Sequence, residues 1–268
     1  MSHNFNRFSV TGEDVLPLGL GTHGHGHAFG GISRDESLEI FDLIYKTLPN
    51  NSKVLIDTAP RYGHGTVETW IGEFLASKQD RFLIATKGGR HIEPERDNEK
   101  DFSKDFLTYD LENSLTRLKA NRVFLYQLHN PTLKTIRDGT VFETLEEFRS
   151  LGLIQWYGVS INHPEEGIAA IETCSRNGYE GLVAIQVIYS ILNKHNLERL
   201  FQLASDARVA IVTREVMVRG FLSDKYSRES EFSNSPSAVR KLVKLYGKNR
   251  HRRDRSGVSR LRCRRSNE

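Results

Sequence analysis

Seven short apolar segments, most of them rich in β-branched residues, alternate with longer amphipathic segments along most of this chain. The alternation is the pattern of βαβ units and indicates a parallel sheet whose strands are joined by helices. The expected strands, in order, are Leu16–Gly21, Val54–Thr58, Phe82–Thr86, Val123–Leu128, Ile154–Val159, Ala184–Tyr189 and Val209–Thr213. The sequence therefore predicts an α/β fold with seven visible strands.

The segments between these strands carry signals of helix ends. Ser33 and Glu36 have the spacing of a capping box. The leucines of Leu107–Leu118 are spaced so that they share one helix face. Pro164 suits the first turn of a later helix, and Gly178 suits its end. We therefore expect helices to connect the strands.

The glycine pattern separates two α/β architectures. No G-x-G-x-x-G segment follows an expected strand and opens a helix, so the fingerprint of an open, doubly wound dinucleotide-binding sheet is missing. A (β/α)8 barrel typically needs about 250 residues, and the chain has 268. We therefore expect a TIM (β/α)8-type barrel over residues 1–249.

Polar residues gather where the expected strands end. In a barrel of this type the chemistry lies at the carboxyl ends of the strands, where the βα loops begin. The residues at or just after those ends are Asp57, Tyr62, Lys87, His129, Ser160, Asn162, Gln186, Tyr189, Arg214 and Glu215. A hydrophobic core does not require an acid, a phenol, an amine and an imidazole on one rim, so we interpret this rim as an active site.

Four of these residues have the chemistry that carbonyl reduction needs, which is a proton donor and a group that polarises the carbonyl oxygen. A free tyrosine has a pKa near 10, and the ammonium of Lys87 beside Tyr62 would lower it. Asp57 would keep Lys87 charged and directed, and His129 could donate a hydrogen bond to the substrate. A Schiff-base aldolase using Lys87 is an alternative, but it gives Asp57 and Tyr62 no clear role.

Local motifs around these residues resemble one family. Asp57–Gly63 resembles the signature of the aldo-keto reductases, an aspartate with a tyrosine five residues later and a glycine after it. Four further segments resemble the lysine strand end, the histidine strand end, the fifth strand and the loop after the barrel, and these are Ala85–Gly89, Tyr126–His129, Tyr157–Ser160 and Phe221–Tyr226. The similarity runs in order from about residue 15 to about residue 226.

The resemblance implies reduction of an aldehyde or ketone by NADPH or NADH, or the reverse reaction, without a metal. It implies that Tyr62 is the general acid, that Lys87 tunes it, and that Asp57 supports Lys87 while His129 orients the carbonyl. It also implies four residues for the nicotinamide, three for its carboxamide and one that stacks on the ring, namely Ser160, Asn162, Gln186 and Arg214. The substrate, and the choice between NADPH and NADH, stay open.

Alternating histidines form a second candidate site, because such tracts can bind transition metals. His23, His25 and His27 are separated by single glycines. No carboxylate or cysteine joins them locally, so we expect them to line the pocket and predict no metal site.

The pattern breaks after the seventh strand. The family's barrel has eight strands and a final helix, but only one helical segment, Ser235–Tyr246, follows here. We expect an incomplete barrel that lacks the eighth strand and the final helix. Three explanations are open: a frameshift or splice product that replaced the C-terminal segment, which we favour, a partner chain that completes the barrel, or a non-catalytic relic. The chain would accordingly be a monomer or join a partner chain.

The charge of the chain is uneven. Residues 250–268 hold eight arginines and two acids, so the net charge of +4 leaves the rest of the chain slightly negative. We expect this segment to be a disordered basic tail. It could attract nucleic acid, but it has no aromatic residue for base stacking, so we do not predict a nucleic-acid partner.

The remaining features favour a cytoplasmic protein. Cys174 and Cys263 cannot form a disulfide framework, and neither a secretory leader nor a membrane-spanning run is evident. The sequence thus predicts an NAD(P)H-dependent carbonyl reductase acting on a small molecule. The alternative is a catalytically weak or inactive barrel that senses a cofactor or has a regulatory role.

Overall fold

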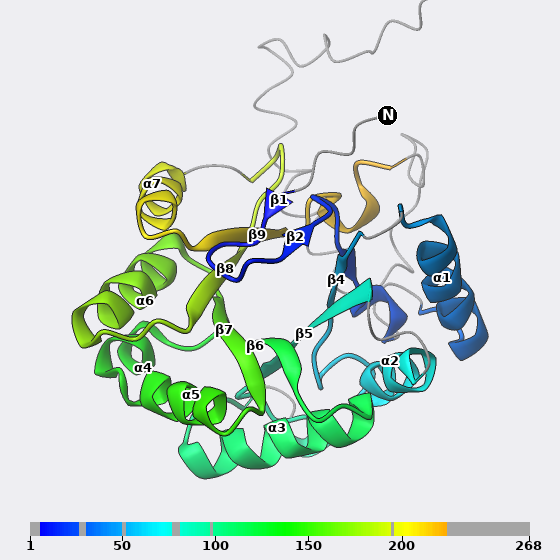
Figure 1. Cartoon of the computed structure of the whole chain (residues 1–268), viewed down its shortest axis with the longest axis horizontal. Coiled ribbons are helices and arrows are strands. Elements are labelled where there is room, and N and C mark those ends of the chain that lie inside the picture. The colour runs from blue at the N-terminus through cyan, green and yellow to red at the C-terminus, as the bar shows by residue number, and fades with distance from the viewer. Residues whose placement is uncertain are drawn as a thin grey trace, which may run out of the picture. The chain divides into compact units, whose positions relative to one another are not determined.

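The structure is a computed structural model (Figure 1). It describes residues 6–26, 31–49, 52–76, 81–96, 99–193 and 196–223. Residues Met1–Val218 form one compact unit, and residues 219–268 form a second, of which 219–223 are described. The predicted helix at 235–246, the basic tail and the boundary at residue 249 lie outside the described residues.

Seven parallel strands form one sheet in chain order. Their bounds are β3 Leu20–Gly21, β4 Val54–Asp57, β5 Phe82–Gly88, β6 Val123–His129, β7 Ile154–Ser160, β8 Leu182–Ile188 and β9 Ala210–Arg214. The sheet curves into a nearly closed barrel with β3 and β9 as its two ends (Figure 1). The prediction of an α/β barrel with seven parallel strands is confirmed.

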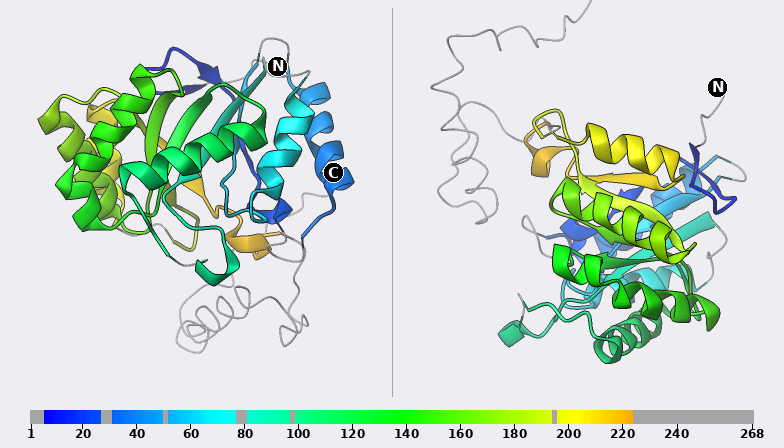
Figure 2. Two further views of the ribbon diagram at one scale, coloured as in Figure 1. Left: turned by 90° about the horizontal axis from the view of Figure 1, so that it is seen from below. Right: turned by 90° about the vertical axis from the view of Figure 1, so that its left-hand side faces the viewer.

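Helices cover the outer side of the strands (Figure 2). They are α1 Arg34–Thr47, α2 Thr66–Leu75, α3 Lys104–Leu118, α4 Leu133–Asp138, α5 Thr140–Ser150, α6 Pro164–Asn177 and α7 Glu198–Asp206, with 3-10 turns at His23–His25, Pro94–Arg96 and Val218–Gly220. The predicted capping box of Ser33 and Glu36 starts α1. Pro164 and Gly178 begin and cap α6 as expected. No helix in the described ranges is long and apolar enough to cross a membrane.

Several predicted strand ends were wrong by one or two residues. β5, β6, β7 and β9 run on through residues that the sequence placed after the strands, because ladder pairs such as His129 with Ser160 and Ile188 with Arg214 extend the pairing. The first strand is shorter than predicted, since only Leu20 and Gly21 pair with β4. Six of the ten polar rim residues therefore lie within the ends of their strands rather than in loops.

The interior of the barrel is apolar toward the amino ends of the strands and polar at their carboxyl ends. An antiparallel hairpin, β1 Asn6–Arg7 and β2 Asp14–Val15, precedes the barrel. Phe8 and Val15 of this region belong to the inner apolar cluster with Leu83 and Ala85 of β5. Side chains on a strand alternate between faces, so Leu83, Ala85 and Lys87 share the inner face of β5. Lys87 thus lies next to the inner apolar cluster, on the side of the carboxyl ends of the strands.

Candidate active site

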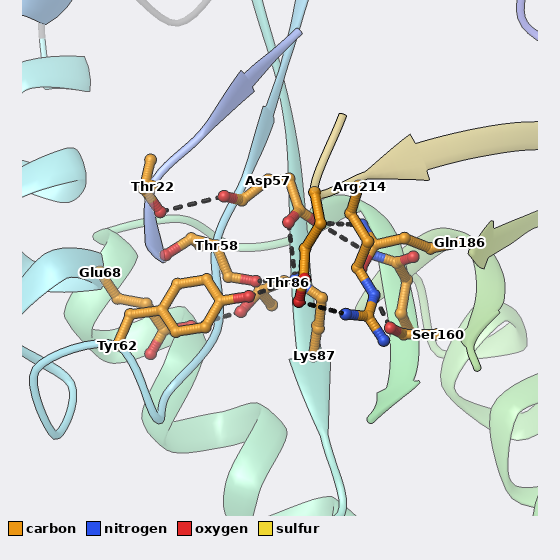
Figure 3. Close-up of polar contacts among 12 residues, drawn as sticks. Thr22, Asp57, Thr58, Tyr62, Glu68, Thr86, Lys87, Ser160, Gln186 and Arg214 are labelled. Atoms are coloured by element: carbon orange, nitrogen blue, oxygen red, sulfur yellow. Dashed lines mark hydrogen bonds and ion pairs between the residues drawn. The ribbon is translucent and has the colours of Figure 1, made fainter. Parts of the chain in front are cut away.

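Asp57, Lys87 and Tyr62 form a connected line at the upper end of β4 and β5 (Figure 3). The Nζ atom of Lys87 lies 2.8 Å from both carboxylate oxygens of Asp57 and donates to the carbonyl of Thr58 at 2.9 Å. It also lies 3.2 Å from the hydroxyl of Tyr62. Only 1% of Lys87 is exposed, so all of these contacts hold the ammonium inside the protein.

The loop after β4 brings Tyr62 back over Lys87. The Tyr62 amide donates to the Ala59 carbonyl at 2.9 Å, which closes a tight turn. Gly63 follows with φ of +63°, a left-handed conformation that glycine adopts without a steric penalty. The spacing in the signature segment is thus explained by local structure. The turn brings the tyrosine, five residues after the aspartate, to hydrogen-bonding distance from the lysine.

Two amide side chains fix the Asp57 carboxylate from the other strands. Gln127 of β6 donates to Asp57 Oδ1 at 3.1 Å, and Gln186 of β8 donates to the same oxygen at 2.8 Å. Sequence reasoning missed Gln127. Its signal was a polar residue in the middle of an apolar strand, which is costly to bury unless it is hydrogen-bonded.

The ionisation of Tyr62 and Lys87 follows from their burial and from the charges around them. Burial raises the pKa of Tyr62, and although Lys87 opposes this, the pKa stays above its ordinary value. Burial lowers the pKa of Lys87, but the carboxylate of Asp57 outweighs it, so the Lys87 pKa is raised. Lys87 thus lowers the pKa of Tyr62, as predicted from the sequence, but burial raises it by more.

His129 ends β6, opposite Ser160 of β7. Removal from water, together with the positive charges of Lys87 and Arg90, holds the pKa of His129 well below its ordinary range. The imidazole is therefore neutral at physiological pH, and one ring nitrogen carries a proton that it can donate.

The four residues expected to hold a nicotinamide fall into two groups. Ser160 and Gln186 are buried, and the Ser160 hydroxyl donates to Gln186 Oε1 at 3.0 Å. Arg214 donates to the Ile161 carbonyl at 3.0 Å and to Asn162 Oδ1 at 3.2 Å, while Asn162 is exposed. Ser160 and Gln186 therefore extend the Asp57 cluster, and Asn162 and Arg214 lie together beside it.

The histidine tract divides between different environments. The ring of His23 lies 4.9 Å from the ring of Tyr62. His25 is buried, lies 3.0 Å from the Ser37 hydroxyl and stacks on Phe41. His27 lies outside the described residues. In the described part of the chain, no group of three or more histidine, cysteine or acidic side chains could hold a metal ion.

A second polar cluster lies on the outer side of β5. It consists of Glu68, Thr86, Asp110 and Arg117, and we call it the Glu68 network. Glu68 of α2 accepts from the Thr86 hydroxyl at 2.5 Å and pairs with the Arg117 guanidinium of α3 at 2.8 Å. Asp110 of α3 accepts from the Gly89 amide at 3.0 Å. Both acids are buried. The network therefore includes Thr86, directly before Lys87, and contacts Gly89, two residues after it.

The titration of Asp110 predicts a pH-dependent stability. Burial, opposed by the Gly89 amide and reinforced by the charge of Glu68, raises the pKa of Asp110 to about 7. Arg117 lowers this pKa and Glu93 raises it. Since the folded state keeps a proton that the unfolded chain releases near pH 4, the Asp110 contribution to stability falls as pH rises from about 4 to about 7.

Asp110→Asn keeps an acceptor for Gly89 but removes this titration. We therefore expect the melting temperature of the variant to fall less than that of the wild type between about pH 5 and about pH 8. Thermal melts by circular dichroism at several pH values measure the difference. Asp206→Asn, at an exposed aspartate of α7, is the control and should follow the wild type. Parallel curves for wild type and Asp110→Asn would contradict the prediction.

Comparison with known proteins identifies one family. The model of the aldo/keto reductase family matches residues 17–257. Two Bacillus subtilis proteins are each 27% identical to the chain: the uncharacterized oxidoreductase YqkF, over 79% of the chain and 64% of its own length, and the aldo-keto reductase YhdN, over 85% and 66%. The chain thus spans slightly less than two thirds of these curated relatives.

A solved structure has the same fold. The holo form of the aldo-keto reductase AKR11C1 from Bacillus halodurans is 26% identical and superposes with a TM-score of 0.71, covering 91% of this chain and 77% of that one. The family model, the relatives and the solved structure all point to the same family. The chain belongs to the aldo/keto reductase family.

Proposed function

We propose that the chain reduces an aldehyde or ketone to an alcohol with NADPH or NADH and that Tyr62 is the proton donor. The observation that carries the proposal is the line of contacts from Asp57 through the buried Lys87 to Tyr62, with 2.8 Å and 3.2 Å between the interacting atoms. This line places a phenol, held by an ammonium, at the carboxyl ends of the strands, where barrel enzymes act.

The proton transfer follows from the two pKa directions. The phenol of Tyr62 stays protonated because burial raises its pKa. When the carbonyl oxygen gains negative charge, the Tyr62 hydroxyl donates its proton, and Lys87 at 3.2 Å stabilises the phenolate that remains. Asp57 keeps Lys87 protonated through both carboxylate oxygens, so the positive charge is present before the reaction begins.

His129 has a different part in the proposal. As a neutral imidazole it can donate a hydrogen bond to the carbonyl oxygen without competing as a strong acid. A charged imidazolium is disfavoured by removal from water and by Lys87. We therefore assign to His129 the orientation of the substrate and to Tyr62 the transfer of the proton.

The residues near the strand ends fit a nicotinamide. A bound cofactor would supply the hydride that reaches the carbonyl carbon. The Ser160 hydroxyl donates to Gln186 and keeps lone pairs that can accept from a carboxamide. Asn162 and Arg214 lie beside it, and a guanidinium can stack on an aromatic ring through its planar face. The proposal assigns the carboxamide to Ser160, Gln186 and Asn162, and the ring to Arg214.

Cofactor binding can be tested directly by fluorescence. We expect the purified chain to change nicotinamide fluorescence saturably with NADPH or NADH. Ser160→Ala removes one hydrogen-bonding group, so it should weaken binding by about three- to ten-fold. Ser150→Ala, at an exposed serine at the end of α5, is the matched control and should bind as the wild type does. The absence of saturable binding, or equal affinities for both variants, would contradict the assignment.

Turnover should be assayed in both directions with a panel of aldehydes and alcohols. Relatives of this chain include a D-threo-aldose 1-dehydrogenase of a Pseudomonas species, 24% identical over 80% of the chain, so we include aldoses in the panel. Saturable cofactor binding without any turnover would support the alternative of a cofactor-sensing barrel. The cytoplasmic location, the partner chain and the disordered tail stay predictions.

A further inference from the structure

Residues before and after Lys87 are hydrogen-bonded to two helices outside the barrel. On one side, the Thr86 hydroxyl donates to Glu68 of α2. On the other side, the Gly89 amide donates to Asp110 of α3. Figure 3 shows Thr86 and Glu68 beside the Lys87 cluster. Neither acid is among the hydrogen-bond partners of Lys87, so an effect on the position of the amine passes through the strand.

We propose that Glu68 and Asp110 are positioning residues. By holding the end of β5 from the side that faces the helices, they set the distance between Lys87 Nζ and the Tyr62 hydroxyl. The inference rests on the proposed function for its effect on turnover. The predicted effect on the position of Lys87 does not depend on that function, because the contacts of Lys87 exist in the folded protein whether or not a substrate reacts.

The end of β5 pairs with β6 but has few contacts outside the barrel, because Gly88 and the next residue, Gly89, have no side chain. A Cβ atom at Gly88 would lie 1.7 Å from the Tyr126 hydroxyl, and one at Gly89 would lie 2.1 Å from the Phe102 ring. Only glycine fits at both positions, so neither residue can pack a side chain to hold the strand. The hydrogen bonds to Glu68 and Asp110 do this instead.

Stability alone is a poor explanation for the two acids. Burying two carboxyl groups near a single guanidinium, Arg117, costs free energy that apolar residues of similar volume would avoid, and the raised pKa of Asp110 reflects this cost. An apolar residue at position 68 or 110, however, could not accept a hydrogen bond from Thr86 or Gly89. The acids are therefore better explained by the groups that they hold than by the stability that they add.

Thr86→Val tests the first anchor, since valine has the shape of threonine and suits a strand. We expect kcat to fall roughly ten- to hundred-fold, because a small displacement of Lys87 disturbs the proton transfer, with little change in KM. The alkaline limb of the pH–rate profile should move to higher pH, because Tyr62 loses part of its cationic neighbour. Thr86→Ser keeps the hydroxyl and should restore both values.

A second measurement does not need turnover. With carbon-13 in the hydroxyl-bearing ring carbon of tyrosine, the Tyr62 resonance, assigned with Tyr62→Phe, should shift in Thr86→Val and return in Thr86→Ser. Thr173→Val, at a buried threonine of α6, is the control for a general loss of stability and should leave the resonance in place. Asp110→Leu removes the second anchor together with a carboxyl group that is costly to bury, so it should fold and shift the same resonance.

The outcomes separate the two proposals. A wild type that never turns over contradicts the proposed function, while the Tyr62 resonance still decides the inference. If Thr86→Val and Asp110→Leu leave the Tyr62 resonance unchanged, the positioning role is overturned, whatever the activity. If the wild type is active and Thr86→Val changes only its melting temperature, Thr86 is merely structural and the positioning role is likewise overturned.

Discussion

Replacing Tyr62 with phenylalanine is expected to lower kcat for carbonyl reduction by about 10²- to 10⁴-fold. The substitution removes one oxygen, and with it the proton that the phenol would transfer and the partner that Lys87 contacts at 3.2 Å. The ring stays, so its contact with His23 and its place in the turn after β4 are retained. Cofactor affinity, measured by nicotinamide fluorescence, should therefore change little while turnover falls.

The exposed tyrosine of α3 is a matched control for this experiment. Tyr109 is 59% exposed, and Tyr109→Phe makes the same chemical change away from the site. Its kcat should equal that of the wild type. A Tyr62→Phe variant with normal turnover would remove Tyr62 as the general acid, and then His129 would be the next candidate to examine.

Replacing Glu68 with alanine is expected to lower the free energy of unfolding by about 3–5 kcal/mol. Glu68 is 0% exposed, and its loss leaves the Arg117 guanidinium without the carboxylate that it contacts at 2.8 Å. It also leaves the Thr86 hydroxyl without its acceptor. Urea unfolding followed by circular dichroism measures the change, provided that the transition is two-state.

Two variants show whether this loss comes from the buried charge. Glu147 forms an exposed pair with Lys104, so Glu147→Ala should cost less than about 1 kcal/mol. The double replacement of Glu68 and Arg117 by leucine removes both charges and should recover part of the loss seen with Glu68→Ala. Equal costs for Glu68→Ala and Glu147→Ala would show that the Glu68 network is not the buried structure described above.

The grouping of polar residues at the strand ends could be predicted from sequence because it depends on the order of the strands alone. Parallel strands bring their carboxyl ends to one rim, so Asp57, Lys87 and His129 could be grouped from the position of each after an apolar run. Tyr62 joined them because the signature segment is local. None of these predictions needed the distance between two side chains.

The Glu68 network could not be predicted in the same way. Glu68 and Asp110 lie on helices whose sequences also have exposed acids, and the sequence does not show which acid faces the sheet. Their burial depends on how α2 and α3 pack on β5, which is a property of the assembled fold. The net direction of the Tyr62 pKa could not be predicted for the same reason, because the charged neighbour was visible in the sequence and the depth of burial was not.

The opposite faces of β5 make the strand sensitive to changes in length. Lys87 pairs with Gln127 and Thr86 with Tyr126 across the ladder, and successive side chains point to opposite faces. Inserting or deleting one residue before Thr86 would turn the amine toward the helices and the hydroxyl toward the interior. Homologous chains can therefore exchange side chains on β5 more readily than they can gain or lose a residue there, and indels should be confined to the loops that β5 joins.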